Sequence, residues 1–206
     1  FIYLNRPAMH NSIKNIILMP FTFICWSLFG PTTTTYLLKD IGWTIKLPSE
    51  FKLEESSVIA KESKDGIVIL ENVSHLNINT TATKNLISAS KDQLNQFNVT
   101  LSKSTAPNDH YWDSVNNNVL KIFYKAMVKQ VPPDAKVDSS RTVETIDGIP
   151  FKSFRMDIKI NNNLVVHNFI ITKLYKGSTL SINYDFTDES VGEEIKKMIG
   201  ESAFVK

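Results

Sequence analysis

The chain of 206 residues has one cysteine, Cys25, and lacks the common glycine-rich and serine motifs of nucleotide-binding and catalytic sites. Seven glycines occur, and none has the spacing of a dinucleotide-binding or phosphate-binding loop. No Gly-x-Ser-x-Gly sequence is present, so the chain offers no nucleophile elbow. A single cysteine also excludes an internal disulfide and a zinc site built from several thiolates. Stability must therefore come from the hydrophobic core.

The chain also lacks a strong excess of charge of either sign. It contains 23 Lys and Arg residues and 21 Asp and Glu residues, for a formal net charge of +2 at pH 7. Arg6 and Lys14 are the only charged residues among the first thirty, so the remainder of the chain is formally neutral. A neutral domain has no sustained positive field to attract nucleic acid. We therefore expect no nucleic-acid partner.

The first thirty residues contain no Asp or Glu and include an uncharged apolar segment, residues 16–29. This segment is shorter than the about 20 residues that span a bilayer, but it has the length of the apolar region of a signal peptide. Lys14 would supply the positive charge that precedes such a region. We expect residues 1–35 to be a signal peptide or N-terminal anchor plus a Thr-rich linker at 32–35. The protein is then exported, and periplasmic or envelope-associated.

Two alternatives to a cleaved signal peptide stay open. Gly30-Pro31-Thr32 offers no small-x-small cleavage pattern, so the apolar segment could remain as a membrane anchor. Cys25 could be lipidated, although Phe23 and Ile24 place bulky side chains where a lipobox has small ones. The other reading of Cys25 is a buried apolar thiol, because cysteine packs as a small hydrophobe.

Residues 36–206 are enough for a single domain with one sizeable core. Apolar and polar residues alternate over 43–47, which predicts a half-buried strand that Pro48 ends. Two extended segments on either side of a polar stretch predict a hairpin within 86–101. Residues 54–72 stay open between a helix and a strand, because their apolar run fits both.

Apolar residues recur at intervals of three and four over 109–130, which is the period of an amphipathic helix. The stripe comprises Trp112, Val115, Val119, Ile122 and Ala126, widened by Tyr111, Phe123 and Met127. Asp109 is placed to cap this helix, and Pro132 and Pro133 are placed to end it. We predict a long helix over 109–130 that buries the stripe.

From Arg141 to Phe186 the pattern predicts four strands joined by tight turns. The turns are Asp-Gly at 147–148, Asn-Asn-Asn at 161–163 and Lys-Gly at 176–177. Consecutive strands with turns this short must run antiparallel. The segment is therefore predicted to form a meander.

Within the second of these strands, the apolar residues change from odd to even positions at Lys152-Ser153. We expect a β-bulge there, because a bulge would restore a single inward face. A closing helix follows, with Ser190 and Glu193 at capping-box spacing and Gly200 as its stop. The long helix and the closing helix are both expected to pack on that inward face.

The order of the predicted strands and helices along the chain is itself informative. The chain opens with the strand Gly42-Trp43-x-Ile45-x-Leu47-Pro48-x-x-Phe51, continues with a hairpin and one long helix, and closes with a meander, a helix and Ser202-Ala203-Phe204. Over residues 36–206 this order resembles the PsbP/Mog-like superfamily, which includes extrinsic photosystem subunits, a Ran-binding nuclear protein and small bacterial exported domains or lipoproteins. The resemblance implies an α+β fold, an α/β/α sandwich in which helices cover an antiparallel sheet. It also implies a non-enzymatic binding domain, and it transfers no binding residue, because no functional motif of the family matches.

Two groups of residues are candidates for chemistry or binding. Asp109, His110 and Asp113 lie within one helical turn and could ligate a metal, for which His75 or His167 would have to supply further ligands. The alternative is that these three residues cap the helix or carry charges that are exposed to solvent.

The second group is a row of lysines at intervals of four, Lys121, Lys125 and Lys129. They form a basic stripe opposite the apolar one, and they fit either a solvated helix face or the binding of an acidic partner. No residue is identified as catalytic or cofactor-binding, and we expect no cofactor.

Two functional classes remain. The first is an exported, non-catalytic binding or accessory domain that binds a protein or lipid partner, with possible membrane association through residues 16–29. The second is an envelope hydrolase or metal-dependent enzyme whose site assembles only in three dimensions. They are distinguished by whether His75, His110, His167 and acidic residues converge in one pocket.

Overall fold

The computed structural model describes residues 33–74, 82–160 and 164–205. The apolar segment 16–29, Cys25, His75 and the turn at 161–163 lie outside the described residues. The elements in chain order are β1 (Thr33–Leu38), β2 (Trp43–Pro48), β3 (Lys52–Leu53), α1 (Ser56–Ser74), β4 (Thr83–Asp92), β5 (Asn95–Lys103), α2 (Asp109–Gln130), β6 (Lys136–Ile146), β7 (Ile149–Ile160), β8 (Leu164–Tyr175), β9 (Ser178–Phe186), α3 (Glu189–Gly200) and β10 (Ala203–Phe204).

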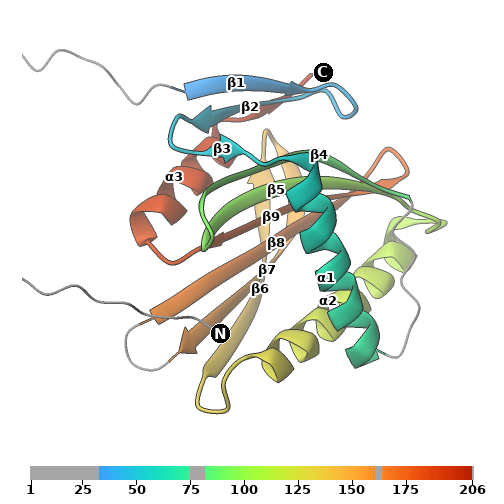
Figure 1. Ribbon diagram of the computed structural model, residues 1–206. Helices are drawn as coiled ribbons and strands as arrows, with labels where there is room; N and C mark the ends of the chain where they lie inside the picture. The colour runs from blue at the N-terminus through green and yellow to red at the C-terminus, as the bar shows by residue number, and fades with distance from the viewer. Residues whose placement is uncertain (1–32, 75–81, 161–163, 206) are drawn as a thin grey trace, which may run out of the picture. The chain divides into compact units, whose positions relative to one another are not determined.

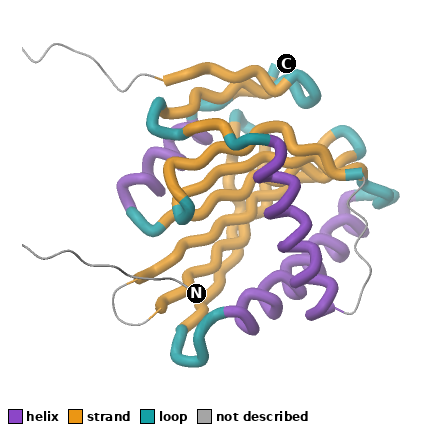
Figure 2. Tube along the Cα trace, in the orientation of Figure 1, coloured by secondary structure: helices purple, strands orange, loops and turns teal. Residues whose placement is uncertain are grey.

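A seven-stranded antiparallel sheet in the order β3-β4-β5-β9-β8-β7-β6 dominates the fold (Figures 1 and 2). Its last four strands are the predicted meander, which is confirmed. Asp147 and Gly148 turn the chain with φ of 48° and 76°, and Lys176 and Gly177 do so with φ of 49° and 76°. Positive φ at both central residues matches the twist of the flanking strands. A second sheet of three strands, in the order β1-β2-β10, lies beside β3 (Figure 1).

The earlier strand predictions are also confirmed. In β2, Trp43, Ile45 and Leu47 are buried while Lys46 between them is exposed. The predicted hairpin is the β4–β5 pair, which runs from Thr83 opposite Ser102 to Asp92 opposite Asn95 with register shifts after Asn85 and after Ser90. The open segment 54–72 is helical and forms most of α1.

The expected bulge at Lys152-Ser153 is wrong, because β7 keeps an unbroken register with both of its neighbours. The parity change has another cause, which is that both faces of β7 are covered. Phe151 packs into the main core, whereas Phe154 and Met156 pack into a second cluster on the opposite face. A strand buried on both faces needs no single apolar parity.

The expectation that both helices share one face is wrong for the same reason. The main core contains Val191, Ile195 and Met198 of α3 and the even-numbered apolar residues of β9. The second cluster contains Leu120 of α2, with Phe123, Tyr124 and Met127 packed around it. The sheet is therefore the middle layer, with α3 on one face and α2 on the other. Figure 2 shows α1 beside α2 and apart from α3.

The long helix begins and ends where predicted, but its buried face is rotated. The buried residues of α2 are Trp112, Asn116, Leu120 and Ala126. Val115 and Val119 of the predicted stripe are 43% and 55% exposed. Buried Asn116 explains the error: it donates to Thr172 Oγ1 at 3.1 Å, so a polar residue takes a core position through a hydrogen bond that only the fold supplies.

Three boundary expectations also need correction. The cap of α2 is Asn108, whose Oδ1 accepts from the Tyr111 amide at 2.9 Å, and not Asp109. The cap of α3 is Asp188, which accepts from the Ser190 amide at 2.8 Å, in place of the expected Ser190. Thr33–Thr35, expected within a linker, pair with Lys46–Pro48 as the first half of β1. The first half of β1 is held by backbone hydrogen bonds to β2, which need no particular side chains, so the sequence pattern did not reveal this strand.

Candidate binding surface

The seam between α2 and strands β6 and β7 is hollowed along its length. Leu120 of α2 and Phe154 of β7 join the helix to the sheet in the second cluster. One hollow of about 490 Å³ is lined by Leu120, Lys121, Tyr124, Lys125, Ser139, Ser140, Arg141 and Phe154. A second, of about 310 Å³, shares Leu120 and Arg141 with it and extends to Val143 and Lys152.

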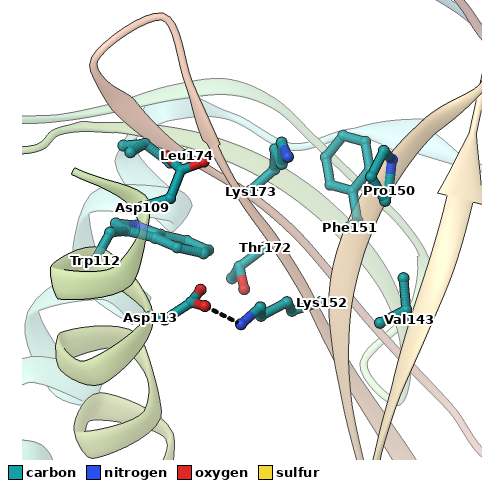
Figure 3. A pocket seen from close by; sticks show the side chains of 10 residues that line it. All are labelled: Asp109, Trp112, Asp113, Val143, Pro150, Phe151, Lys152, Thr172, Lys173 and Leu174. Atoms are coloured by element: carbon teal, nitrogen blue, oxygen red, sulfur yellow. Dashed lines mark ion pairs between the residues drawn. The ribbon is translucent and has the colours of Figure 1, made fainter.

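A third hollow, of about 180 Å³, continues the seam at the start of α2 (Figure 3). It shares Val143 and Lys152 with the second hollow and is lined on the helix side by Asp109, Trp112 and Asp113. We call the three hollows together the α2–β6 groove.

The charges along the α2–β6 groove are mostly positive. Lys121 and Lys125 are exposed and, with Arg141, form no ion pair among the residues that the structure describes. Arg141 is held in place, because its Nη1 donates to Asn117 Oδ1 at 3.0 Å and its guanidinium lies over the Phe154 ring at 5.7 Å. The groove therefore presents three uncompensated cations over an aromatic and aliphatic floor.

The predicted metal candidates lie at one end of this groove, but they do not form a cluster. Asp113 Oδ2 is 2.5 Å from Lys152 Nζ, as Figure 3 shows, so its charge is already paired. His110 is exposed and does not line the groove. Over residues 33–74, 82–160 and 164–205 there is no group of three or more His, Cys, Asp or Glu residues that could hold a metal ion. Asp109, His110 and Asp113 therefore stay candidates only, and no metal site is predicted for them.

The structure separates the members of the predicted lysine stripe. Lys121 and Lys125 line the α2–β6 groove, whereas Lys129, one turn further along α2, is exposed and does not. Arg141 and Lys152, which periodicity did not single out, take its place. Each stands between uncharged neighbours on its strand, so no charge pattern along the sequence marks them.

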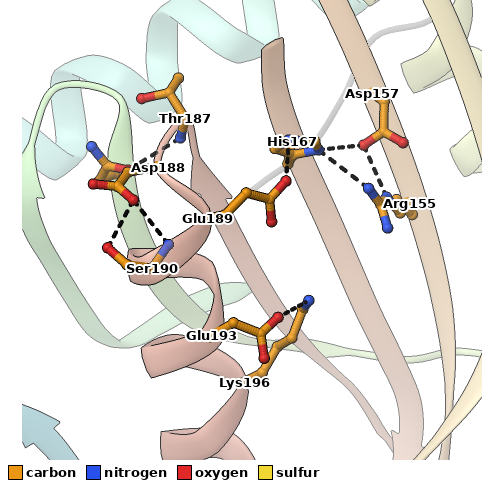
Figure 4. A network of polar contacts seen from close by, with 10 residues as sticks. Arg155, Asp157, His167, Thr187, Asp188, Glu189, Ser190, Glu193 and Lys196 are labelled. Atoms are coloured by element: carbon orange, nitrogen blue, oxygen red, sulfur yellow. Dashed lines mark hydrogen bonds and ion pairs between the residues drawn. The ribbon is translucent and has the colours of Figure 1, made fainter.

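His167 lies on the opposite face of the sheet, in a polar network that the sequence did not reveal (Figure 4). Its Nδ1 is 2.6 Å from Asp157 Oδ1, and its Nε2 is 3.1 Å from Glu189 Oε1 at the start of α3. Its ring stacks on Phe186 with centroids 4.7 Å apart. Burial acts to raise the pKa of Asp157, but hydrogen bonds from Arg155 and His167 outweigh it and lower that pKa. The network joins β7, β8 and α3, and the only sequence signal for it was the interruption of an apolar strand by His167.

A second polar pair was also missed, on the α2 face of the sheet. Asn168 Nδ2 donates to Asp185 Oδ1 across β8 and β9. Burial raises the pKa of Asp185 above its ordinary value, and the hydrogen bond from Asn168 offsets this only in part. Asn168 Oδ1 is buried and has no hydrogen-bond partner in the described part of the chain.

The helix α1 is the least embedded of the helices. None of its described side chains is buried, in contrast to four in α2 and four in α3. Between α1, α2 and the sheet lies a cavity of about 330 Å³, lined by Leu70, Ser74, Asn116, Val119, Leu120, Ile122, Phe123, Ile170, Thr172, Thr179 and Ser181. No described helix is both long enough and apolar enough to cross a membrane.

Comparison with known proteins supports the fold and leaves the function open. No protein-family model matches the chain, and no curated protein matches it. The solution structure of cyanobacterial PsbP (CyanoP) from Synechocystis sp. PCC 6803 is similar at 8% identity, with a TM-score of 0.53, over 88% of this chain and 97% of that chain. The chain therefore has the PsbP/Mog-like fold, as its sequence pattern predicted.

Two further structures are similar at lower scores. LpqN of Mycobacterium tuberculosis, involved in cell envelope biogenesis, is 14% identical over 85% of this chain and 91% of that chain, with a TM-score of 0.44. The Ran-binding protein Mog1p of Saccharomyces cerevisiae is 8% identical over 86% of this chain and 97% of that chain, also with a TM-score of 0.44.

Proposed function

We propose that this chain is a non-catalytic binding domain and that the α2–β6 groove is the surface with which it holds an acidic protein partner. The observation that carries the proposal is the set of three cations, Lys121, Lys125 and Arg141, around one groove without an ion pair among the described residues. Complementary charge steers association and selects the partner. Tyr124, which is half-buried, lines the groove beside the buried Phe154 and offers the aromatic contact area that binding surfaces use.

The distribution of titratable groups favours binding over catalysis. Acid-base or metal chemistry needs its groups to converge on one reacting atom. His110 lies at the start of α2, whereas His167 lies on the other face against α3. Of the two carboxylates that line the groove, Asp109 and Asp113, the second is paired with Lys152. These positions support the non-catalytic reading.

Export to the periplasm or cell envelope is part of the same proposal. It is supported by the apolar, acid-free segment at 16–29 and by the absence of cysteine from residues 26–206. A domain without thiols is insensitive to the oxidising conditions of that compartment.

The groove can be tested with a fluorescent peptide of ten glutamates as the probe. Reversing Lys121 and Lys125 together to Glu should weaken binding about tenfold, because each lost contact between exposed charges is worth up to about 1 kcal/mol. The matched control reverses Lys61 and Lys64 on α1, which are also exposed and lie outside the groove. Binding measured by anisotropy should also weaken from 20 to 150 mM salt.

Equal loss in the control variant would show that net charge, and not the groove, attracts the probe. Binding that neither variant changes would remove the α2–β6 groove from consideration. In either case the surface assignment fails.

A further inference from the structure

We propose that the acidic partner binds as an extended strand, which pairs with the free edge of β6 and carries an acidic side chain at every second position. The inference rests on the proposed function and deepens it, since it names the conformation and the sequence pattern of the partner.

The first observation is the edge itself. The strand β6 ends the seven-stranded sheet, pairs with β7 over all eleven of its residues, and pairs with no other described strand. Its register is unbroken and it contains no proline. At the other end of the sheet, β3 is only two residues long. Every second residue of an edge strand points its N–H and C=O outward, so β6 offers a long template for one more strand.

The second observation is the exposure of β6. Most of its residues are exposed, and Val143 is 66% exposed. An uncovered β-branched residue on a flat edge is normally guarded by a bulge, a proline or a covering loop. Within the described chain β6 has no bulge, proline or covering loop, and the charged side chains that it does carry select a partner of matching charge, so the edge is available to such a partner.

The third observation is the difference between the two faces of β6. Val137, Ser139, Arg141 and Val143 share the face of Met156 and Phe154, which is the face that α2 covers. A strand added beside them would place every second side chain toward Lys121, Lys125 and Arg141. The alternate side chains would lie toward the face of Asp138 and Glu144, where an acid is repelled. The pattern that fits is therefore acidic and neutral in alternation.

The same geometry disfavours a second copy of this chain as the occupant. Two β6 edges that pair antiparallel keep matching faces on the same side of the joined sheet. Both α2 helices would then lie on that side, with Lys121 and Lys125 of each directed toward the shared seam. Like charges brought together oppose this dimer and favour an acidic strand.

The test compares two ten-residue peptides of identical composition and charge, on the full chain. One alternates Thr and Glu, and the other has five Thr followed by five Glu. We expect the alternating peptide to bind at least about tenfold more tightly in an anisotropy titration at 50 mM salt. Equal affinity would overturn strand addition while leaving the acidic groove in place. No binding of either peptide would overturn the proposed function as well.

Backbone pairing is tested separately with N-methylated peptides. In a strand, the amides of all Glu residues point one way and those of all Thr residues point the other. Methylating one set should abolish binding, because it removes the donors that face β6, whereas methylating the other set should leave the affinity within about twofold. Loss in both or in neither would refute pairing with the edge. A dimer of the unliganded chain in analytical ultracentrifugation, broken by Val143→Lys, would assign the edge to a second copy instead.

Discussion

Among single residues, Gly192 illustrates how tight packing limits substitution. A Cβ at this position in α3 would lie 2.5 Å from two atoms of the Phe186 ring. That ring is itself stacked on His167 and packed beside Phe169, so it has little room to move. We expect Gly192→Ala to lower the free energy of unfolding by about 1–3 kcal/mol, since overpacking outweighs the gain of about 1 kcal/mol in helix propensity.

The matched control is Gly200→Ala at the other end of α3, where a Cβ meets nothing within 4 Å. It should leave stability unchanged or raise it by up to about 1 kcal/mol. Urea unfolding of both variants measures the difference. A Gly192→Ala protein as stable as the Gly200→Ala protein would show that Phe186 is free to shift.

Asp185 is a residue whose charge opposes folding. Its pKa is raised in the folded chain, so its contribution favours the fold at low pH and is lost as the pH rises through that raised value. Asp185→Asn removes the buried charge and offers an amide donor to Asn168 Oδ1, which has no partner among the described residues. We expect this variant to be more stable by about 1–2 kcal/mol at pH 7, from the usual cost of an unsatisfied buried group.

The extra stability of the Asp185→Asn variant should shrink toward pH 3, because protonated Asp185 in the parent offers a similar hydrogen-bond donor to Asn168. Asp157→Asn is the control, for which the expected change in stability has the opposite sign. The pKa of Asp157 is lowered, so its contribution is present above the unfolded-state value of about 3.9 and is lost as the pH falls below it. This variant should be less stable than the parent at pH 7, with a difference that narrows in acid. Parallel pH profiles for the two variants would contradict both assignments.

Among the elements, α1 should be the first to open. No described side chain of α1 is fully buried, and the stability of a region follows the apolar contacts that hold it. Its amides should exchange with solvent much faster than those of α2 in a hydrogen-exchange experiment. Asp65→Pro in α1 should then lower the melting temperature less than Asn118→Pro in α2, although both positions are exposed and both prolines break a helix. Equal losses would mean that α1 is an integral part of the core.

The positions of most elements could be predicted from the sequence, but the faces that they cover could not. The meander was located correctly because its signals are local. They are the alternation of apolar and polar residues in β9 and the turn at Asp147-Gly148. In β7 the same alternation was misread as a bulge, because a pattern along one strand does not reveal that helices cover both sides of the sheet. The buried face of α2 was misjudged for a similar reason, since Asn116 is acceptable inside only beside Thr172.

For the whole molecule, the candidate site was predictable only in part. Lys121 and Lys125 could be identified from their spacing along one helix. Arg141 and Lys152 come from two strands, and only the tertiary fold brings them beside α2. The free edge of β6 is likewise a property of strand order, which no single segment encodes.

The extent of the folded unit is a prediction at the same scale. A chain that begins at Thr33 should melt at the same temperature as the full chain, because β1 begins there. One that begins at Tyr36 loses three paired positions of β1 and should melt about 2–4 °C lower, the shift expected for about 1 kcal/mol in a domain of this size. A large loss on removing residues 1–32 would contradict their assignment as an export segment outside the fold.

The contacts between the two ends of the described chain govern when this chain is able to fold during its synthesis. The indole Nε1 of Trp43 donates to Ser202 Oγ at 2.8 Å, across 159 residues of sequence, and Asn98 of β5 bonds Asn183 of β9 across 85. Contacts between residues so far apart in the sequence form slowly, because closing the long loop between them costs entropy. They also cannot form until the ribosome has made the later of the two residues. The nascent chain must therefore stay incompletely folded until residues 202–204 have emerged, a state in which a chaperone can still engage it.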